Sequence, residues 1–142
     1  MLVVDTSVAV KWVVPEDGAG IERGTAEALQ LLPRGLVAPD CLLGEFANAL
    51  FKKVQRGEIG MQQARQSVSI LPTIVDLVPL AGLISPALEL AFHLMHPVHD
   101  CAFLALALQI EHPLVTADQA FVEKCRSSNP EFPLYLLGED LP

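Results

Sequence analysis

The stretch Leu2-Val3-Val4-Asp5-Thr6-Ser7 indicates the fold class at the very start of the chain. Its three apolar residues predict a short buried strand that ends at Asp5. Ser7 is a residue type that caps helices, and we expect a helix from Val8 to about Val13, stopped by Pro15. A strand that passes directly into a helix is typical of an α/β fold.

The same alternation of short apolar runs and longer helical patterns continues along the chain. We expect further strands at residues 36–38, 74–80, 114–116 and 134–137. We expect further helices at about residues 21–32, 41–55, 61–71, 87–95, 98–110 and 118–125. Asp40 is expected to cap the helix that ends before Gly57, and Pro79 to confine the third strand to an edge or an end of the sheet. Strands separated by helices predict a mostly parallel sheet with helices on both faces.

Length and composition indicate one domain with more apolar surface than it needs for itself. The chain has 142 residues, enough for a core of its own. Hydrophobic residues make up 51%, charged residues 18%, and the mean hydropathy is +0.42. We therefore expect part of the surface to face a partner. No apolar run reaches the roughly 20 residues that a membrane helix requires, so we expect no membrane association.

The N-terminus indicates a cytoplasmic protein. Residues 1–5 have no basic residue before their apolar run and meet an acid at once, unlike a signal peptide. Cys41, Cys101 and Cys125 are odd in number, far apart and set among apolar neighbours. We interpret them as packed thiols and not as a disulfide framework or zinc ligands.

The net charge of -8 argues against a nucleic-acid binder held by general electrostatic attraction, because such proteins are usually basic. A nuclease with this charge has to attract its substrate locally, through metal ions and a small basic patch. An acidic chain is also suited to a basic partner.

Four acids, far apart in the sequence, fall at equivalent places of the expected sheet. Asp5 ends the first strand, Glu45 lies in the first turns after the second, Asp100 begins the helix before the strand at 114–116, and Asp118 follows that strand. In a parallel sheet these places all meet at the carboxyl edge, where α/β folds bind ligands. We therefore expect the four carboxylates to form one site.

Gathered carboxylates repel one another and are stabilised by a cation. Mg²⁺ prefers oxygen ligands and is commonly held by one or two protein carboxylates together with a substrate phosphate. Such an ion lowers the pKa of an attacking water and stabilises the transition state. Helix N-termini at Asp100 and Asp118 would add favourable dipoles near a phosphate. This set of groups predicts hydrolysis of phosphodiester bonds.

Each acid also has a structural interpretation. Asp5 and Asp118 are plausible helix caps. Glu45 lies roughly opposite the apolar stripe of its helix, so it is either a solvated residue or a site residue followed on the same face by the phosphate-binding cations Lys52 and Arg56. The expected stripe consists of Leu43, Phe46, Ala47, Leu50 and Val54.

Asp100 is the hardest acid to explain structurally, because it is the only charged residue of an otherwise apolar helix and needs a cap role, a partner or a metal. His93, His96 and His99 offer a competing zinc interpretation, but a proline interrupts the helix between them. The alternative is that His96 or His99 contacts the phosphate or tunes Asp100.

Four ordered segments that span nearly the whole chain carry a family resemblance. They are Val3-Val4-Asp5-Thr6-Ser7-Val8-Ala9-Val10-Lys11-Trp12, Ala38-Pro39-Asp40 leading to Glu45-Phe46-Ala47-Asn48-Ala49-Leu50, His99-Asp100-Cys101-Ala102-Phe103-Leu104-Ala105-Leu106-Ala107, and Leu114-Val115-Thr116-Ala117-Asp118. These segments resemble PIN-domain ribonucleases, specifically VapC-type toxins. The resemblance implies one PIN-like nuclease domain over residues 1–142, with a five-stranded parallel sheet in three α/β/α layers. It also implies a Mg²⁺- or Mn²⁺-dependent endoribonuclease that cuts RNA, forms a homodimer and is inhibited by a small VapB-type antitoxin.

The resemblance also assigns roles by motif position. The family's acidic, metal-binding residues correspond to Asp5, Glu45, Asp100 and Asp118, with Asp5 and Asp100 as direct ligands. The supporting positions correspond to Thr116, Thr6, Ser7 and Asn48. The chain departs from the family at His99, where members often have tyrosine, and at His96, where they often have a small hydroxyl residue. These departures leave the acids intact and affect local substrate contacts.

Rival functions remain open at this stage. Receiver domains and haloacid-dehalogenase-like phosphatases also place an acid after the first strand, but receivers need adjacent acids and the phosphatases need a second aspartate where this chain has Ser7. A non-catalytic protein-binding module is disfavoured by the presence of all four acids. A DNA-directed nuclease is a nearer alternative, because the same site chemistry cuts either polymer and no reader of the 2′-hydroxyl is recognisable.

Overall fold

A five-stranded parallel sheet forms the centre of the computed structural model, which describes residues 1–13 and 21–142, with side chains from residue 24 in the second range. The strands are β1 (Leu2–Val4), β2 (Leu36–Pro39), β3 (Val75–Val78), β4 (Leu114–Thr116) and β5 (Leu134–Leu136). Their order is β3-β2-β1-β4-β5, and every pair is parallel. β3 is an edge strand, as its following proline predicts.

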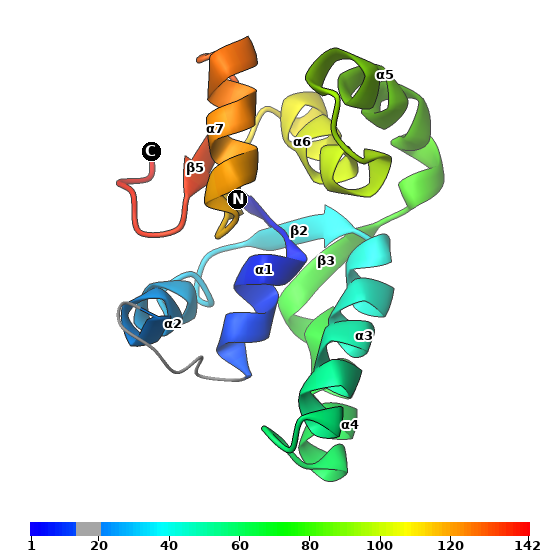
Figure 1. Ribbon diagram of the computed structural model, residues 1–142, viewed down its shortest axis with the longest axis vertical. Helices are drawn as coiled ribbons and strands as arrows, with labels where there is room; N and C mark the ends of the chain where they lie inside the picture. The colour runs from blue at the N-terminus through cyan, green and yellow to red at the C-terminus, as the bar shows by residue number, and fades with distance from the viewer. Residues whose placement is uncertain (14–20) are drawn as a thin grey trace.

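Helices connect the parallel strands and cover both faces of the sheet (Figure 1). They are α1 (Thr6–Ala9), the 3₁₀ turn η1 (Val10–Trp12), α2 (Ile21–Leu29), α3 (Cys41–Gln55), α4 (Met61–Ile74), the 3₁₀ turn η2 (Leu80–Gly82), α5 (Ile84–Leu94), α6 (Val98–Ile110) and α7 (Gln119–Ser128). Figure 1 shows α1 to α4 on one side of the sheet and α5 to α7 on the other. The predicted three-layer α/β/α architecture is therefore confirmed.

The start of the first helix differs from the sequence prediction. Asp5, not Ser7, is the N-cap, because Asp5 Oδ1 accepts a hydrogen bond from the backbone N–H of Val8 at 3.3 Å. The α-helix lasts only four residues before it tightens into η1. The predicted stop at Pro15 lies outside the described residues.

Other boundaries shift by a few residues. α2 ends at Leu29, three residues early, and α4 continues past Pro72 to Ile74. α5 begins before Pro86, which lies in its first turn, where proline removes no helical hydrogen bond. Asp40 occupies the N-cap position of α3, but its Oδ1 accepts from the backbone N–H of Leu80 at 3.0 Å and ties the start of α3 to η2.

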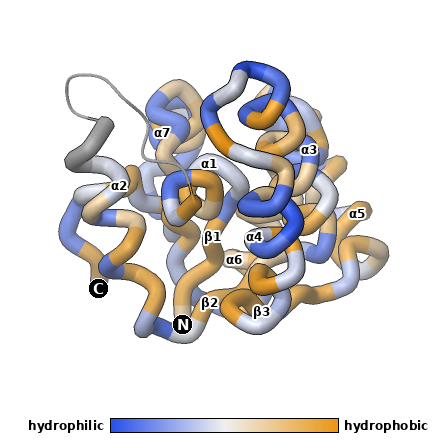
Figure 2. Tube along the Cα trace, turned by 90° about the horizontal axis from the view of Figure 1, so that it is seen from below, coloured by the Kyte–Doolittle hydropathy of each residue, from blue (hydrophilic) through white to orange (hydrophobic). Residues whose placement is uncertain are grey.

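α6 is the core helix of the molecule. Every residue from Cys101 to Ala107 is buried, and α6 contacts β1, β2 and β4 on one side and α5 on the other. β1 is fully buried as well, and Figure 2 shows β1 and β2 mainly in hydrophobic colours. This packing fixes the first turn of α6, which carries Asp100, relative to the end of β1.

The three cysteines are free thiols, as predicted. Cys101 and Cys125 are buried and Cys41 is half-buried. Burial, together with the charge of Glu45, raises the pKa of Cys41 to about 12, so this thiol stays protonated. Among the described helices none is long and apolar enough to cross a membrane by itself, and α5 and α6 reach that length only as a pair bent by 113°.

Candidate active site

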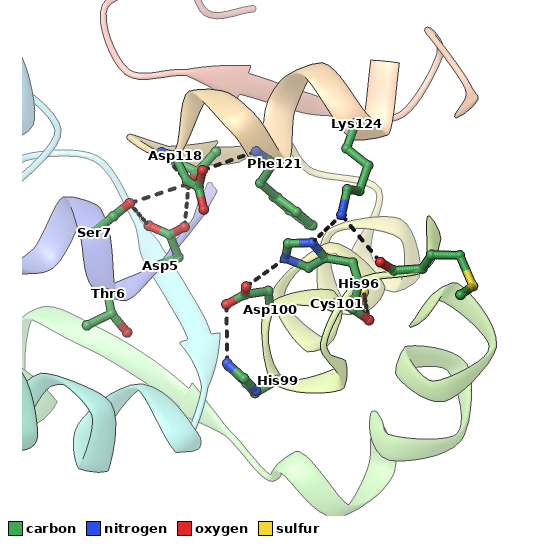
Figure 3. A network of polar contacts seen from close by, with 12 residues as sticks. Asp5, Thr6, Ser7, His96, His99, Asp100, Cys101, Asp118, Phe121 and Lys124 are labelled. Carbon is green, nitrogen blue, oxygen red and sulfur yellow. Dashed lines mark hydrogen bonds and ion pairs between the residues drawn. The ribbon is translucent and has the colours of Figure 1, made fainter. Parts of the chain in front are cut away.

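The carboxyl ends of the strands and the starts of α3, α6 and α7 lie at one edge of the sheet. Asp5 directly follows β1, and Thr116 is the last residue of the neighbouring strand β4. Asp118 caps α7 two residues later, and Asp100 is the third residue of α6. Figure 3 shows Asp5, Asp100 and Asp118 around this edge. The topology thus brings together acids that are up to 113 positions apart (118 − 5).

Asp5 is half-buried and accepts three hydrogen bonds. Ser7 Oγ donates to Asp5 Oδ1 at 2.6 Å, and the backbone N–H of Val8 donates to the same oxygen at 3.3 Å. Thr116 Oγ1 donates to Asp5 Oδ2 at 2.5 Å. Both carboxylate oxygens are therefore fixed in direction by hydroxyl groups from two different elements.

The orientation of the two hydroxyl groups is itself set by the backbone. The N–H of Ala117 donates to Ser7 Oγ at 2.9 Å, and the N–H of Asp118 donates to Thr116 Oγ1 at 3.1 Å. Each hydroxyl oxygen is thus an acceptor from the β4–α7 connection, and its own hydrogen is directed to the Asp5 carboxylate. Ser7 and Thr116 are supporting groups of Asp5 in this structure.

The environment of Asp5 disfavours its negative charge. Burial raises the pKa of Asp5 from 3.8 to about 6, although the hydrogen bonds from Ser7, Thr116 and Val8 lower it. The charge of Asp100 is a smaller cause of the same increase. A cation at this position would relieve both the burial cost and the repulsion between the two acids.

Glu45 is half-buried, contrary to the expectation that it lies opposite the apolar stripe of its helix. The fully buried residues of α3 are Leu42, Phe46 and Leu50, at four-residue steps. Phe46 and Leu50 belong to the predicted stripe, but Leu42 is buried in place of Leu43. The buried side is therefore turned toward Glu45, and α1 packs against α3. Thr6 Oγ1 of α1 donates to Glu45 Oε1 at 3.4 Å.

The second oxygen of Glu45 is an unsatisfied acceptor. Oε2 is buried and has no hydrogen-bond partner among the described residues. Burial raises the pKa of Glu45, with a further contribution from the charge of Asp100, whereas Cys41, His99 and Thr6 lower it. A buried carboxylate oxygen without a partner is costly, and a cation or an ordered water would stabilise it.

Asp100 is hydrogen-bonded to His96, and His99 lies near its other oxygen. His96 Nε2 lies 2.7 Å from Asp100 Oδ2, and His99 Nε2 lies 3.8 Å from Asp100 Oδ1 (Figure 3). His93 lies exposed on α5. The geometry therefore joins His96 and His99 to Asp100, which is the second of the two interpretations of the histidine series.

Asp118 combines a structural role with a place at the site. Its Oδ1 accepts from the backbone N–H of Phe121 at 3.1 Å, so it caps α7 as its sequence position predicts. Its backbone N–H donates to Thr116 Oγ1, which connects it to the Asp5 network.

Three predicted residues are not brought to the acids. Asn48, Lys52 and Arg56 are exposed on or just after α3. With a rise of about 1.5 Å per residue, Lys52 and Arg56 lie roughly 10 and 16 Å along the helix from Glu45. At these distances Lys52 and Arg56 can contact other parts of an extended polymer but not the bond that reacts at the acids.

Lys124 is a site neighbour that the sequence analysis missed. Its Nζ lies 3.2 Å from His96 Nδ1 and donates to the carbonyl of Met95 at 3.3 Å. The available signal was the three-residue spacing of Asp118, Phe121 and Lys124, which places them on one side of α7.

The acids have the right chemistry for a hard divalent cation, although they do not enclose one as they stand. In the part of the chain with described side chains, no three His, Cys, Asp or Glu residues are grouped closely enough to hold an ion. Mg²⁺ commonly takes only one or two protein carboxylates and keeps several waters. Asp5 and Asp100 supply carboxylates, the type of ligand that such a partly hydrated ion takes.

Comparison with known proteins agrees with this architecture. The sequence profile of the PIN domain matches residues 2–127. The chain belongs to the PIN domain family. This match confirms the family resemblance that the sequence indicated. PIN domains are generally nucleases.

Two solved structures share the fold of this PIN domain. PAE2754 from Pyrobaculum aerophilum is 16% identical with a TM-score of 0.69, and the match covers 96% of this chain and 88% of that one. VapC20 from Mycobacterium tuberculosis, a sarcin-ricin loop cleaving toxin, is 20% identical with a TM-score of 0.66, covering 87% of this chain and 94% of that one. No curated protein sequence matches the chain significantly.

Proposed function

We propose that residues 1–142 form a single metal-dependent endoribonuclease domain that hydrolyses RNA phosphodiester bonds and acts as the toxin of a toxin-antitoxin pair. The observation that carries the proposal is the uncompensated negative charge at the carboxyl edge. Asp5 is half-buried with a pKa raised to about 6, Asp100 repels it, and Glu45 Oε2 has no hydrogen-bond partner in the described part of the chain. In a member of a nuclease family, this is a place for a divalent cation.

Asp5 and Asp100 are the proposed direct ligands of Mg²⁺ or Mn²⁺. When bound, such an ion lowers the pKa of an attacking water and stabilises charge on the phosphate. Ser7 and Thr116 hold the two oxygens of Asp5 in fixed directions, so the ligand needs little reorganisation.

Glu45 and Asp118 complete the proposed site. Burial raises the pKa of Glu45, which makes this carboxylate a better proton acceptor near neutral pH, and we assign it the proton of the attacking water. Thr6 fixes the other oxygen of Glu45. Asp118 supports Thr116 and adds negative potential for a water-mediated contact with the ion.

The RNA substrate is proposed from two observations. VapC20, which shares the fold, is a toxin that cleaves the sarcin-ricin loop. The exposed cations Lys52 and Arg56 continue along α3 from Glu45 and are suited to contact phosphates outside the cleaved bond. With a net charge of -8, the chain depends on such local attraction.

The partners are proposed from the apolar surface. Four side chains on or at the end of α5 are 39% to 82% exposed: Ile84, Leu88, Phe92 and Met95. Exposed apolar surface of this kind favours an interface, and we assign it to a homodimer. A basic VapB-type antitoxin would complement the acidic site, and an RNA-cleaving toxin with such a partner would act in the cytoplasm.

Cleavage of end-labelled structured RNA by the partner-free protein tests this function. The protein is expected to cut RNA with Mg²⁺ or Mn²⁺, to stop in EDTA, and to leave single-stranded and duplex DNA of the same sequence intact. Equal cutting of DNA would shift the proposal to a nuclease without sugar selectivity. No cutting of transfer, ribosomal or messenger RNA with either metal would overturn it.

A further inference from the structure

A continuous line of polar contacts leads from α7 to Asp100. Lys124 Nζ lies 3.2 Å from His96 Nδ1, and His96 Nε2 lies 2.7 Å from Asp100 Oδ2 (Figure 3). Each ring nitrogen of His96 therefore has one polar partner. Asp118 and Lys124 belong to the same helix, so α7 approaches the acids at two points.

The chemistry of the two partners fixes the direction of these bonds. A lysine ammonium can only donate, so His96 Nδ1 must be the unprotonated, accepting nitrogen of the ring. The proton of the neutral imidazole then lies on Nε2 and is donated to Asp100 Oδ2. Lys124 thereby selects one tautomer of His96, and that tautomer presents a donor to the carboxylate.

Packing holds the ring of His96 in place. The His96 side chain is only 13% exposed, and its ring centroid lies 4.6 Å from that of Phe121, with the rings tilted by 43°. The preceding residue, Met95, ends α5 with a left-handed backbone (φ 52°), and its carbonyl accepts from Lys124 Nζ at 3.3 Å. Lys124 therefore binds both the turn that carries His96 and the ring itself.

We propose that Lys124 and His96 are positioning residues that hold the Asp100 carboxylate in one orientation, with Oδ2 bound to His96 Nε2 and Oδ1 left for a divalent cation. The inference rests on the proposed function, because it gives Asp100 a metal to bind. Oδ1 has His99 Nε2 at 3.8 Å, beyond hydrogen-bond range, so this oxygen is the less engaged of the two. Groups that orient a metal-binding carboxylate in this way typically change metal affinity on the order of 10- to 100-fold when removed.

The tautomer of His96 is the first readout, and it requires neither metal nor activity. In ¹⁵N-labelled, metal-free protein, the side-chain nitrogen shifts of His96 are expected to show a protonated Nε2 and an unprotonated Nδ1. Lys124→Met removes the donor and is expected to shift His96 to a mixture of tautomers, whereas Lys124→Arg keeps a donor and is expected to retain the single tautomer. A protonated Nδ1 in the unchanged protein would overturn the inference.

Mn²⁺ affinity is the second readout, measured by titration of the same proteins. Lys124→Met and His96→Ala are each expected to weaken binding about tenfold, and the double variant about as much as either alone, because both act on one bond to Asp100. Lys124→Arg and His96→Gln, which keep donors, should recover much of the affinity. Arg65→Met on α4 removes an exposed charge elsewhere and should leave the affinity unchanged.

Different results would contradict the positioning role of Lys124 and His96 and the proposed nuclease function. If the unchanged protein binds Mn²⁺ and cuts RNA but Lys124→Met binds the ion as tightly, the positioning role is wrong and the proposed function stands. If the two single losses add in full in the double variant, Lys124 and His96 act independently and the inference also fails. If the unchanged protein binds no divalent ion, the proposed function falls and the inference falls with it.

Discussion

Thr116 Oγ1 donates a hydrogen bond to Asp5 Oδ2 and joins the ends of β4 and β1 across 111 positions of the sequence. The same oxygen accepts from the backbone N–H of Asp118. Thr116 is the only fully buried polar residue in the described part of the chain, and its side-chain hydrogen bonds to Asp5 and Asp118 both serve the acidic site. This single hydroxyl links the strand order of the sheet to the geometry of the carboxylates.

Replacement of Thr116 by valine is expected to destabilise the protein by about 1–3 kcal/mol. The substitution leaves Asp5 Oδ2 without this donor and the backbone N–H of Asp118 without its acceptor, and both hydrogen bonds are partly buried. Thr116→Ser retains the hydroxyl and should lose less than half as much. Urea unfolding in EDTA measures both values, and equal losses in the two variants would show that the methyl group, not the hydroxyl, matters.

The free energy of unfolding of the metal-free protein should depend on pH because of the titration of Asp5. Its pKa is raised from 3.8 to about 6 in the folded protein, so the folded state binds this proton more tightly than the unfolded chain. The stability gained from this group is fully present below about pH 4 and is lost as the pH rises through about 6.

Asp5→Asn isolates that contribution. The variant lacks the titration, so its free energy of unfolding should rise relative to that of the unchanged protein between pH 4 and pH 7, by up to about 3 kcal/mol. Added Mg²⁺ should narrow the difference at pH 7, because the ion stabilises only the carboxylate. A difference that stays constant from pH 4 to pH 7 would contradict the raised pKa.

Glu45→Gln separates the effect of the Glu45 charge on stability from its role in catalysis. Because Oε2 has no partner in the described structure and burial raises the pKa of Glu45, the metal-free variant should be at least as stable as the unchanged protein at pH 7. Its rate of RNA cleavage should fall at least 100-fold if Glu45 accepts a proton in the reaction. Glu131→Gln, at an exposed position, is the matched control and should change neither quantity.

The apolar side of α5 should determine the oligomeric state. Phe92 is 65% exposed, so Phe92→Glu should fold normally and shift a dimer toward monomer in analytical ultracentrifugation. Met61→Glu, at a position on α4 that is 62% exposed, introduces the same charge elsewhere and should remain dimeric. A dimer that survives Phe92→Glu would place the interface on another surface.

Local patterns in the sequence predict most of the fold. The run from Val98 to Ile110 is helical with the expected boundaries, because its apolar residues and the preceding proline leave no competing structure. The strand at 114–116 and the cap at Asp118 are likewise where local chemistry puts them. The short strand followed by an acid, repeated with helices between, is sufficient to predict that Asp5 and Asp118 share an edge.

Features that depend on packing between elements could not be predicted in the same way. The burial of Glu45 results from α1 lying over α3, which the helical wheel of α3 alone does not contain. Ser7 was a plausible cap, but its hydroxyl is used by Asp5 and Ala117. The sequence around Lys124 is typical of a surface position. Its contacts with Met95 and His96 depend on the packing of α7 against the turn between α5 and α6.

The most direct test of the central claim is the single-turnover rate of RNA cleavage as a function of Mn²⁺ concentration, for the unchanged protein and for Asp100→Asn prepared identically and free of any partner. The account predicts a rate that saturates with Mn²⁺ in the unchanged protein and is at least 100-fold lower in Asp100→Asn, with both proteins equally folded in EDTA. Cleavage that is independent of added metal, or that persists at full rate in the variant, would contradict the assignment of this edge of the sheet as a metal-dependent nuclease site.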